Sequence, residues 1–254
     1  MFALLRRRLR TGTATARWPW SGSQPGWRTQ PAYEATRCDL NGACATACPT
    51  GAIGVTAGVA FSLDRGACIS CGRCIEACGP GALTVAATAS RAVVSRAELF
   101  VPLRVAPGPG AEELARRARS VLGRSLHVRH LDAGSCNGCD WEINATTNAV
   151  HDLQRFGIDF VASPRHADVL LVTGTMDRNL ELAARRTYDA MADPRVVVAV
   201  GACAVSGATY PAGYASGDGA ASVLPVDVLI PGCPPRPEAI IEGLLLAVGR
   251  LGSR

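Results

Sequence analysis

A chain of 254 residues has room for one or two domains with hydrophobic cores, and its 48% hydrophobic content is typical of a globular protein. It has no run of about 18 apolar residues, which excludes a membrane-spanning helix from the expected structure. The formal net charge of +5 arises in residues 1–30, which hold six arginines and no acidic residue, so a basic nucleic-acid-binding body is also excluded.

Residues 1–30 are predicted to form a basic amphipathic arm. Apolar residues alternate with the arginines, and three tryptophans follow at positions 18, 20 and 27. Such a segment can lie on an anionic membrane face or dock on membrane-embedded subunits. The alternatives are a solvated arm, an arm that docks on another partner protein, and a mitochondrial transit peptide, which is also rich in arginine.

The eleven cysteines favour metal binding over disulfides. Their number is odd, and no secretory signal precedes them. Every cysteine falls into one of three groups that are described next, which is the expectation for reduced thiolates that hold metal.

Residues 31–90 are predicted to form a two-cluster ferredoxin domain. A 30-residue repeat places Cys38, Cys44 and Cys48 in register with Cys68, Cys74 and Cys78. The second copy adds Cys71 and has the spacing of bacterial ferredoxins, in which three close cysteines bind one cubane and the fourth crosses to the other. We therefore expect one 4Fe–4S cluster on Cys68, Cys71, Cys74 and Cys48. A pair of structural zinc sites is the alternative.

The first copy of the repeat is incomplete because Asn41 stands where the second ligand belongs. With the same crossover, the other cluster has only Cys38, Cys44 and Cys78. We expect a 3Fe–4S centre, a labile 4Fe–4S centre with a foreign fourth ligand, or an empty site.

Residues 91–124 are predicted to be a linker with a short helix. The run PGPG at residues 107–110 marks the linker, and the helix is expected over residues 111–123.

Residues 125–254 alternate between strand and helix patterns, which predicts an α/β domain with a parallel sheet covered on both faces. Strands are predicted near residues 126–131, 158–162, 168–173, 195–201 and 226–231, and helices near 142–156, 178–192 and 237–250. The long segment 204–224 between them is expected to be a functional loop that forms part of a partner surface.

Four cysteines of this half follow predicted strands. Cys136 and Cys139 follow the first strand, while Cys203 and Cys233 follow the last two. Because parallel strands end at the same edge of a sheet, these thiolates are expected to converge on one metal or cluster site.

Several motifs of the C-terminal half resemble two related families. They are residues 134–140 (GSCNGCD), 155–157 (RFG), 163–170 (SPRHADVL), 201–204 (GACA) and 231–237 (PGCPPRP). One family is the small subunit of energy-converting NiFe hydrogenases, and the other is the terminal-cluster subunit of respiratory complex I, also called the 20 kDa or B-type subunit. The separation of Cys136 from Cys139 by two residues is similar to the hydrogenases, since the complex I subunit usually has two adjacent cysteines there.

The N-terminal half resembles the ferredoxin subunit of formate hydrogenlyase, through its basic start, residues 10–15 (RTGTAT) and the cysteine repeat. Asn41 departs from that pattern. The chain is thus similar to a fusion of two neighbouring subunits of a hydrogenlyase-type complex.

The resemblance implies a flavodoxin-like fold for residues 125–254 and a proximal 4Fe–4S cluster on Cys136, Cys139, Cys203 and Cys233. It implies an electron-transfer subunit, not catalytic alone, that relays electrons between the ferredoxin clusters and the NiFe site of a separate large subunit. No cysteine is left to hold nickel in this chain. The expected location is the cytoplasm, peripheral on the inner membrane.

Two alternatives remain open for the function. One is a subunit of a complex I-like NADH/quinone or sulfur-linked oxidoreductase without nickel, and the other is a structural iron–sulfur or zinc protein. At the proximal site, Glu142 is predicted to be a proton partner of the cluster, because a negative cluster raises the pKa of a nearby carboxylate. The alternative is that Glu142 only favours the start of a helix.

Overall fold

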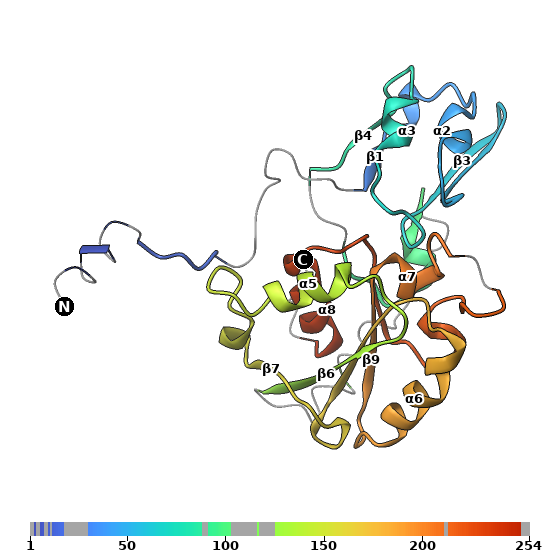
Figure 1. The fold of residues 1–254 in the computed structure, drawn as a ribbon. Coiled ribbons are helices and arrows are strands. Elements are labelled where there is room, and N and C mark those ends of the chain that lie inside the picture. The colour runs from blue at the N-terminus through green and yellow to red at the C-terminus, as the bar shows by residue number, and fades with distance from the viewer. Residues whose placement is uncertain are drawn as a thin grey trace.

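The computed structural model describes residues 3, 6–7, 10, 12–17, 30–87, 91–102, 116, 125–210 and 213–249. These form an N-terminal domain (residues 30–87), a connector (residues 91–102) and an α/β domain (residues 125–249), as Figure 1 shows. Among the described residues, no helix combines the length and the apolar character needed to cross a bilayer. The proposed helix over 111–123 and most of the basic arm lie outside the described residues.

The N-terminal domain consists of two similar halves that follow the 30-residue repeat. Strand β1 (Pro31–Tyr33) pairs antiparallel with β4 (Leu83–Val85), and β2 (Ile53–Thr56) pairs antiparallel with β3 (Ala60–Asp64). Each half also contains one four-residue helix. They are α2 (Ala43–Thr46) and α3 (Arg73–Glu76), and a 3-10 turn, η1 (Ala35–Arg37), precedes the first.

A glycine with left-handed backbone starts each of these two helices. Gly42 and Gly72 both have a φ of 81°, which a residue with a side chain rarely adopts. The first thiol after each glycine, on Cys44 or Cys74, is buried in the small core of the domain. The repeat in the sequence therefore corresponds to a repeat in backbone geometry.

The connector joins the two domains through regular structure. Val93 forms an antiparallel bridge with Leu229 at the edge of the α/β sheet, and Leu99 is buried in the α/β core. The turn η2 (Arg96–Leu99) leads into β5 (Phe100–Val101), which pairs with β3 of the N-terminal domain. The part of the predicted linker that the structure describes is thus packed against both domains.

The α/β domain contains one parallel sheet of five strands in the order β10-β9-β8-β6-β7, which confirms the predicted parallel sheet. The strands are β6 (Leu126–Asp132), β7 (Ile158–Phe160), β8 (Val169–Thr173), β9 (Val196–Val200) and β10 (Val228–Ile230). All residues of β8 and β9 are buried, as expected for the central strands of a sheet with two covered faces.

Alternate strand residues contribute to two separate cores. Helices α5 (Gly138–Ala145) and α8 (Pro237–Ala247) pack on one face of the sheet, with Val198 and Ile230. Helices α6 (Arg178–Asp189) and α7 (Gly201–Ser206) pack on the other face, with Val197 and Leu229. The described residues of this domain also include three 3-10 turns, namely η3 (Leu153–Phe156), η4 (Pro164–His166) and η5 (Ala220–Ser222).

The prediction of a continuous helix over 142–156 is wrong. Helix α5 starts earlier, at Gly138, and ends at Ala145. Thr146 then donates its hydroxyl to the carbonyl of Ile143, and the Asn148 side chain accepts the backbone N–H groups that follow. Short polar side chains that bond to the nearby backbone compete with helix continuation, so the chain turns here. The segment 204–224 also differs from the expected loop, because α7 and η5 occupy part of it.

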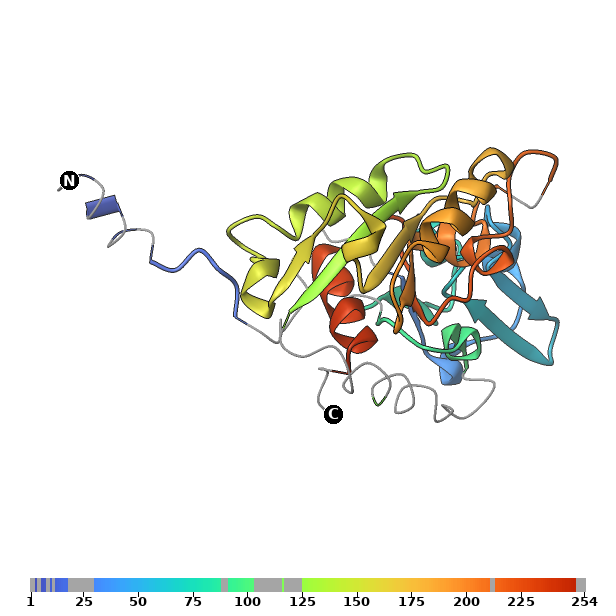
Figure 2. The same ribbon diagram turned by 90° about the horizontal axis from the view of Figure 1, so that it is seen from below.

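Residues Thr15 and Ala16 of the basic arm contact the α/β domain. The Ala16 backbone N–H donates to the carbonyl of Val150 (2.9 Å), and Thr15 donates to the carbonyl of Ala149 (2.9 Å). Arg155 in turn donates to the carbonyl of Ala16 (2.7 Å). The arm therefore leaves the molecule from the α/β domain, on the side away from the N-terminal domain (Figures 1 and 2).

Candidate metal centres

The turn after β6 carries Cys136 and Cys139. Asp132 ends the strand, and its Oδ1 accepts hydrogen bonds from the backbone N–H groups of Gly134 (3.0 Å) and Ser135 (2.7 Å). Asn137 then takes a left-handed backbone conformation, with φ of 64°, and α5 begins at the next residue. This tight turn places Cys139 in the first turn of the helix, half-buried, and leaves Cys136 exposed.

A network of polar side chains supports this turn from the sheet side. Asp140 accepts hydrogen bonds from Ser135 Oγ (3.1 Å) and Thr173 Oγ1 (3.0 Å), and His130 Nε2 lies 3.2 Å from its Oδ1. Burial lowers the pKa of His130, although the carboxylates of Asp140 and Asp132 oppose this. This network was not predicted from the sequence. The alternation of residues along β6 places His130 on the same side of the strand as Asp132, and this was the one signal that could have indicated its position.

The other two cysteines of the α/β domain follow neighbouring strands. Cys203 lies in α7, directly after β9, and Cys233 follows β10. The backbone N–H of Ala202 donates to the carbonyl of Gly232 (2.7 Å), which ties the two loops together.

Gly201 brings these loops against the Cys139 thiol. It has a φ of 87°, and a Cβ built on it would fall on the sulfur of Cys139. The carbonyl of Gly232 would lie 3.5 Å from the same Cβ, in ordinary van der Waals contact. The Cys139 sulfur therefore occupies the space that a side chain at position 201 would need.

The four thiols are close enough to perturb one another electrostatically. Burial, reinforced by the other three thiols, raises the pKa of Cys139. Burial also raises the pKa of Cys203 to about 11, with contributions from Cys233 and Cys136. For Cys233 the pKa is raised by burial and then by Cys136. The structure thus gathers all four predicted thiols at the carboxyl edge of the sheet, and as free thiolates they would repel one another.

In the N-terminal domain, Cys48 joins the thiols of the second copy of the repeat. Burial, followed by the neighbouring thiols that include Cys48 and Cys71, raises the pKa of Cys68 to about 11 and that of Cys74 to about 12. For Cys48, burial acts to raise the pKa, but hydrogen bonds from Thr50 and from nearby backbone groups outweigh it, so the pKa is lowered. The thiol of Cys48, from the first copy, therefore lies near the thiols of the second copy, while its role as a shared cluster ligand stays a prediction.

The thiols of Cys38, Cys44 and Cys78 form the third group. Burial raises the pKa of Cys44, and the other two thiols add to this effect. A cavity beside them is lined by these three cysteines together with Tyr33, Asn41 and other residues. Burial and a hydrogen bond with Cys38 raise the pKa of Tyr33 to about 12, and its ring stacks on Phe61 with centroids 3.9 Å apart.

The side chain of Asn41 is engaged in local hydrogen bonds. Its Oδ1 accepts the backbone N–H of Ala43 (2.9 Å) at the start of α2, and its Nδ2 donates to Asp39 (2.9 Å). Asn41 therefore forms a side-chain turn just before α2, and both polar atoms of its carboxamide have partners in this chain.

The surroundings of the thiols suit soft, thiolate-bound iron. Sulfur atoms accept backbone N–H groups, from Ser70 to Cys68 (3.5 Å) and from Ala82 to Cys78 (3.2 Å). Such hydrogen bonds stabilise thiolate charge, and a cationic iron–sulfur core removes the repulsion between the thiolates. Within the described ranges, no three His, Cys, Asp or Glu side chains are arranged to hold a single metal ion.

The profile of the family described as "NADH ubiquinone oxidoreductase, 20 Kd subunit" matches residues 136–247, which begin at the first of the four thiols. A profile of the 4Fe–4S binding domain matches residues 61–84, the second copy of the repeat. A probable membrane-bound hydrogenase subunit of Pyrococcus furiosus is 45% identical over 51% of this chain and 78% of its own length. The chain belongs to the 20 kDa subunit family.

Two further members of the 20 kDa subunit family show the range of complexes in which related chains occur. Formate hydrogenlyase subunit 7 of Escherichia coli is 44% identical over 55% of this chain and 56% of its own length. The B-type subunit of NADH-quinone oxidoreductase from Desulfovibrio desulfuricans is 45% identical over 56% of this chain and 77% of its own length. Members of this family are subunits of oxidoreductase complexes, and this chain is a subunit of the same kind.

Glu142 lies on α5, one helical turn after Cys139, so both side chains are on the same side of the helix. Burial raises its pKa, and Glu238 adds to the rise, whereas Arg236 and His151 oppose it. A carboxyl whose folded pKa is raised stabilises the fold at low pH, and this contribution is lost as pH rises through the folded pKa. Its role as a proton partner of the proximal centre stays a prediction.

We expect the substitution Glu142→Gln to flatten the pH dependence of the reduction potential at the proximal centre, because the group that takes up a proton on reduction is gone. A redox titration followed by EPR at several pH values above 4.5, the ordinary pKa of a glutamate, measures this slope. A slope equal to that of the wild type would contradict the role.

Proposed function

We propose that this chain is the iron–sulfur electron-transfer subunit of a membrane-associated hydrogenase complex of the formate hydrogenlyase type. The observation that carries the proposal is the gathering of eleven cysteines into three groups, of which two have four thiols. Bound iron–sulfur clusters supply one-electron transfer over a wide range of potentials. The chain holds and tunes them, and it does not turn over a substrate alone.

The proposed ligand sets follow these groups. In the α/β domain they are Cys136, Cys139, Cys203 and Cys233, which hold the proximal 4Fe–4S cluster. In the N-terminal domain, which we interpret as a two-cluster ferredoxin domain, one 4Fe–4S cluster lies on Cys48, Cys68, Cys71 and Cys74, and an incomplete centre lies on Cys38, Cys44 and Cys78. The fusion of the two domains keeps all three centres in one chain at a high effective concentration.

A large subunit is the proposed partner at the proximal site. Cys136 and Cys233 are exposed. Trp141, two residues after Cys139 on α5, is 75% exposed, so this side of the domain presents a large apolar side chain to a partner. A partner that covers this face would shield the proximal cluster from water. The NiFe centre belongs to that partner in this proposal, because every cysteine of this chain is already assigned.

The basic arm is proposed to reach membrane-embedded subunits, so that the chain is peripheral on the cytoplasmic face of the inner membrane. The support is its composition and the contact of Thr15 and Ala16 with the α/β domain, which fixes where the arm leaves the body. The charge of its arginines suits an anionic surface.

A second candidate is a subunit of a complex I-like NADH/quinone or sulfur-linked complex without nickel. The 45% identity to the B-type subunit of an NADH-quinone oxidoreductase supports it. The spacing of Cys136 and Cys139 favours the hydrogenase.

The nickel content of the native complex tests the proposal. The complex is purified anaerobically through a tag on this chain, and nickel and iron are counted by mass spectrometry. The hydrogenase proposal requires about one nickel per large subunit and activity with hydrogen. A complete complex with iron but no nickel would support the second candidate, and zinc in place of iron would contradict both.

A further inference from the structure

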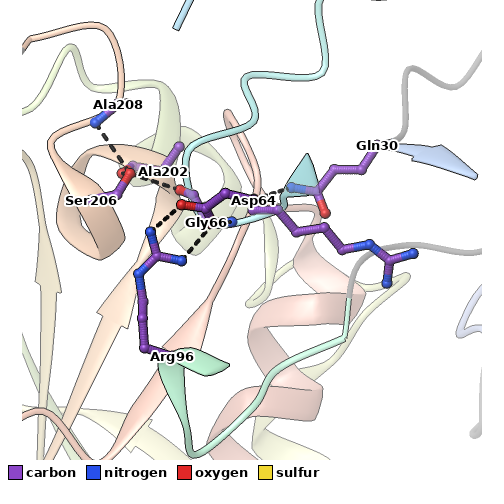
Figure 3. Close-up of polar contacts among 8 residues, drawn as sticks. Gln30, Asp64, Gly66, Arg96, Ala202, Ser206 and Ala208 are labelled. Atoms are coloured by element: carbon purple, nitrogen blue, oxygen red, sulfur yellow. Dashed lines mark hydrogen bonds and ion pairs between the residues drawn. The ribbon is translucent and has the colours of Figure 1, made fainter. Parts of the chain in front are cut away.

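The loop that leads to Cys68 is held by side chains from three other parts of the chain, which carry Gln30, Arg96 and Ser206 (Figure 3). Arg96 of the connector forms a bidentate ion pair with Asp64, at the end of β3. Asp64 also accepts the backbone N–H of Gly66 (2.8 Å). The hydroxyl of Ser206 is shared between the carbonyl of Gly66 (3.0 Å) and that of Ala202 (3.1 Å). Ser206 is the last residue of α7, the helix that contains Cys203.

Gly66 leaves no free space at this contact. It is buried, and a Cβ built on it would fall on the guanidinium of Arg96 and lie 2.8 Å from Val205 Cγ1. Side chains of the connector and of α7 therefore pack directly against the backbone of the loop at Gly66, and a residue with a side chain would not fit there.

The connector carries Arg96 in a capped 3-10 turn. Ser95 and Glu98 form a reciprocal capping box around it, in which the Ser95 N–H donates to Glu98 (3.0 Å) and Ser95 Oγ accepts the Ala97 N–H (3.3 Å). On the N-terminal domain side, the Arg65 N–H donates to the carbonyl of Leu99 (2.9 Å). Arg96 thus reaches Asp64 from a support that is itself anchored in the α/β core through Leu99.

We propose that Arg96, Asp64 and Ser206 form a clasp that fixes the loop of Cys68 against the helix of Cys203. The clasp acts as a positioning device for electron transfer, and this inference rests on the proposed function of the chain. Cys68 lies two residues beyond Gly66, and Cys203 lies three residues before Ser206. The hydrogen bond between Ser206 and Gly66 therefore joins the two segments that carry these cysteines. The clasp makes the four-thiol centre of the N-terminal domain the neighbour of the proximal centre.

The variant Arg96→Met removes the ion pair and keeps much of the side-chain volume, and Ser206→Ala removes the hydrogen bond. The matched control is Arg195→Met, because Arg195 also pairs with an aspartate, Asp193 (3.3 Å), but lies before β9, at the opposite edge of the sheet. Arg96→Lys keeps the charge and serves as the conservative variant.

The experiment uses the full chain, purified anaerobically, with two readouts. EPR of the fully reduced protein measures the magnetic interaction between the two four-thiol centres, which depends on their separation. Hydrogen exchange measures the protection of the Arg65 and Gly66 amides, which does not require any cluster. We expect Arg96→Met to weaken the interaction and to speed exchange of these amides about tenfold, since the loss of a charge-assisted pair has about that effect. Ser206→Ala should act in the same direction, about fivefold.

The outcomes separate the clasp from the proposed function. Unchanged spin interaction and unchanged exchange in the double variant Arg96→Met, Ser206→Ala would overturn the clasp. A wild-type protein without iron–sulfur signals would refute the proposed function and with it the electron-transfer role of the clasp. If Arg96→Met fails to assemble clusters, amide exchange in Ser206→Ala and in Arg96→Lys decides. The Arg65 and Gly66 amides must then exchange faster in Ser206→Ala than in the control Arg195→Met, and in Arg96→Lys they must exchange at nearly the rate of that control.

Discussion

The substitution Asn41→Cys is expected to add about one iron atom per chain and to convert the incomplete centre into a 4Fe–4S cluster with four thiolates. Three thiols, on Cys38, Cys44 and Cys78, already converge beside the cavity that Asn41 helps to line. A cysteine at position 41 supplies the missing soft ligand, whereas the carboxamide of Asn41 bonds to Asp39 and Ala43.

The repeat indicates that the local backbone tolerates this change. Cys71 occupies the equivalent position in the second copy, and α3 there has the same length and the same left-handed glycine as α2. Loss of each local hydrogen bond of Asn41 costs about 1 kcal/mol, which is small beside the bonds that a fourth thiolate makes to iron. Iron analysis together with low-temperature EPR of the oxidised and reduced protein measures the conversion.

The matched control for this prediction is the reverse substitution in the other copy. Cys71→Asn is expected to remove about one iron atom and to give the complete centre the spectrum that the incomplete centre has in the wild type. If wild-type protein already shows two all-thiolate 4Fe–4S signals from the N-terminal domain, or if Asn41→Cys changes neither iron content nor spectrum, the description of the third centre is wrong.

The substitution Gly201→Ala is expected to abolish the proximal centre. The added Cβ would take the place of the Cys139 sulfur, and the φ of 87° is strained for alanine. The conformational strain costs about 1–2 kcal/mol and the overpacking about 1–3 kcal/mol. We expect a loss of about four iron atoms and of the proximal EPR signal, while the signals of the N-terminal domain persist.

Gly58→Ala is the control for this variant. Gly58 has a φ of 66° in the turn between β2 and β3, and its Cβ would meet nothing within 4 Å. It carries left-handed backbone strain without the steric conflict, so it should lower the free energy of unfolding by about 1 kcal/mol and keep all iron. Equal iron loss in both variants would show that backbone strain, and not the sulfur at position 139, explains the effect.

The cysteine pattern predicted most of the candidate sites because ligand spacing constrains geometry directly. Short spacings such as that from Cys136 to Cys139 leave little freedom, and the burial of β8 and β9 could be read from continuous runs of valine and leucine. The convergence of Cys203 and Cys233 followed from the shared edge of parallel strands.

Features that depend on tertiary contacts could not be predicted in this way. The early end of α5 depends on side-chain hydrogen bonds of Thr146 and Asn148, which propensity alone does not reveal. The connector has the composition of a linker, yet the side chain of Leu99 is buried in the α/β core. Arg96 and Ser206 lie far apart in the sequence and carry no motif, so their meeting at Gly66 is visible only in the folded chain.

A redox titration of the anaerobically purified chain, followed by EPR and combined with iron counting, decides whether the chain holds three iron–sulfur centres. We predict three separately titrating centres and about 11 or 12 iron atoms per chain, with the third centre distinguished by its incomplete ligation. A protein that binds zinc in place of iron, or that shows only one iron–sulfur signal at full iron loading, would contradict this description of the chain as an electron path.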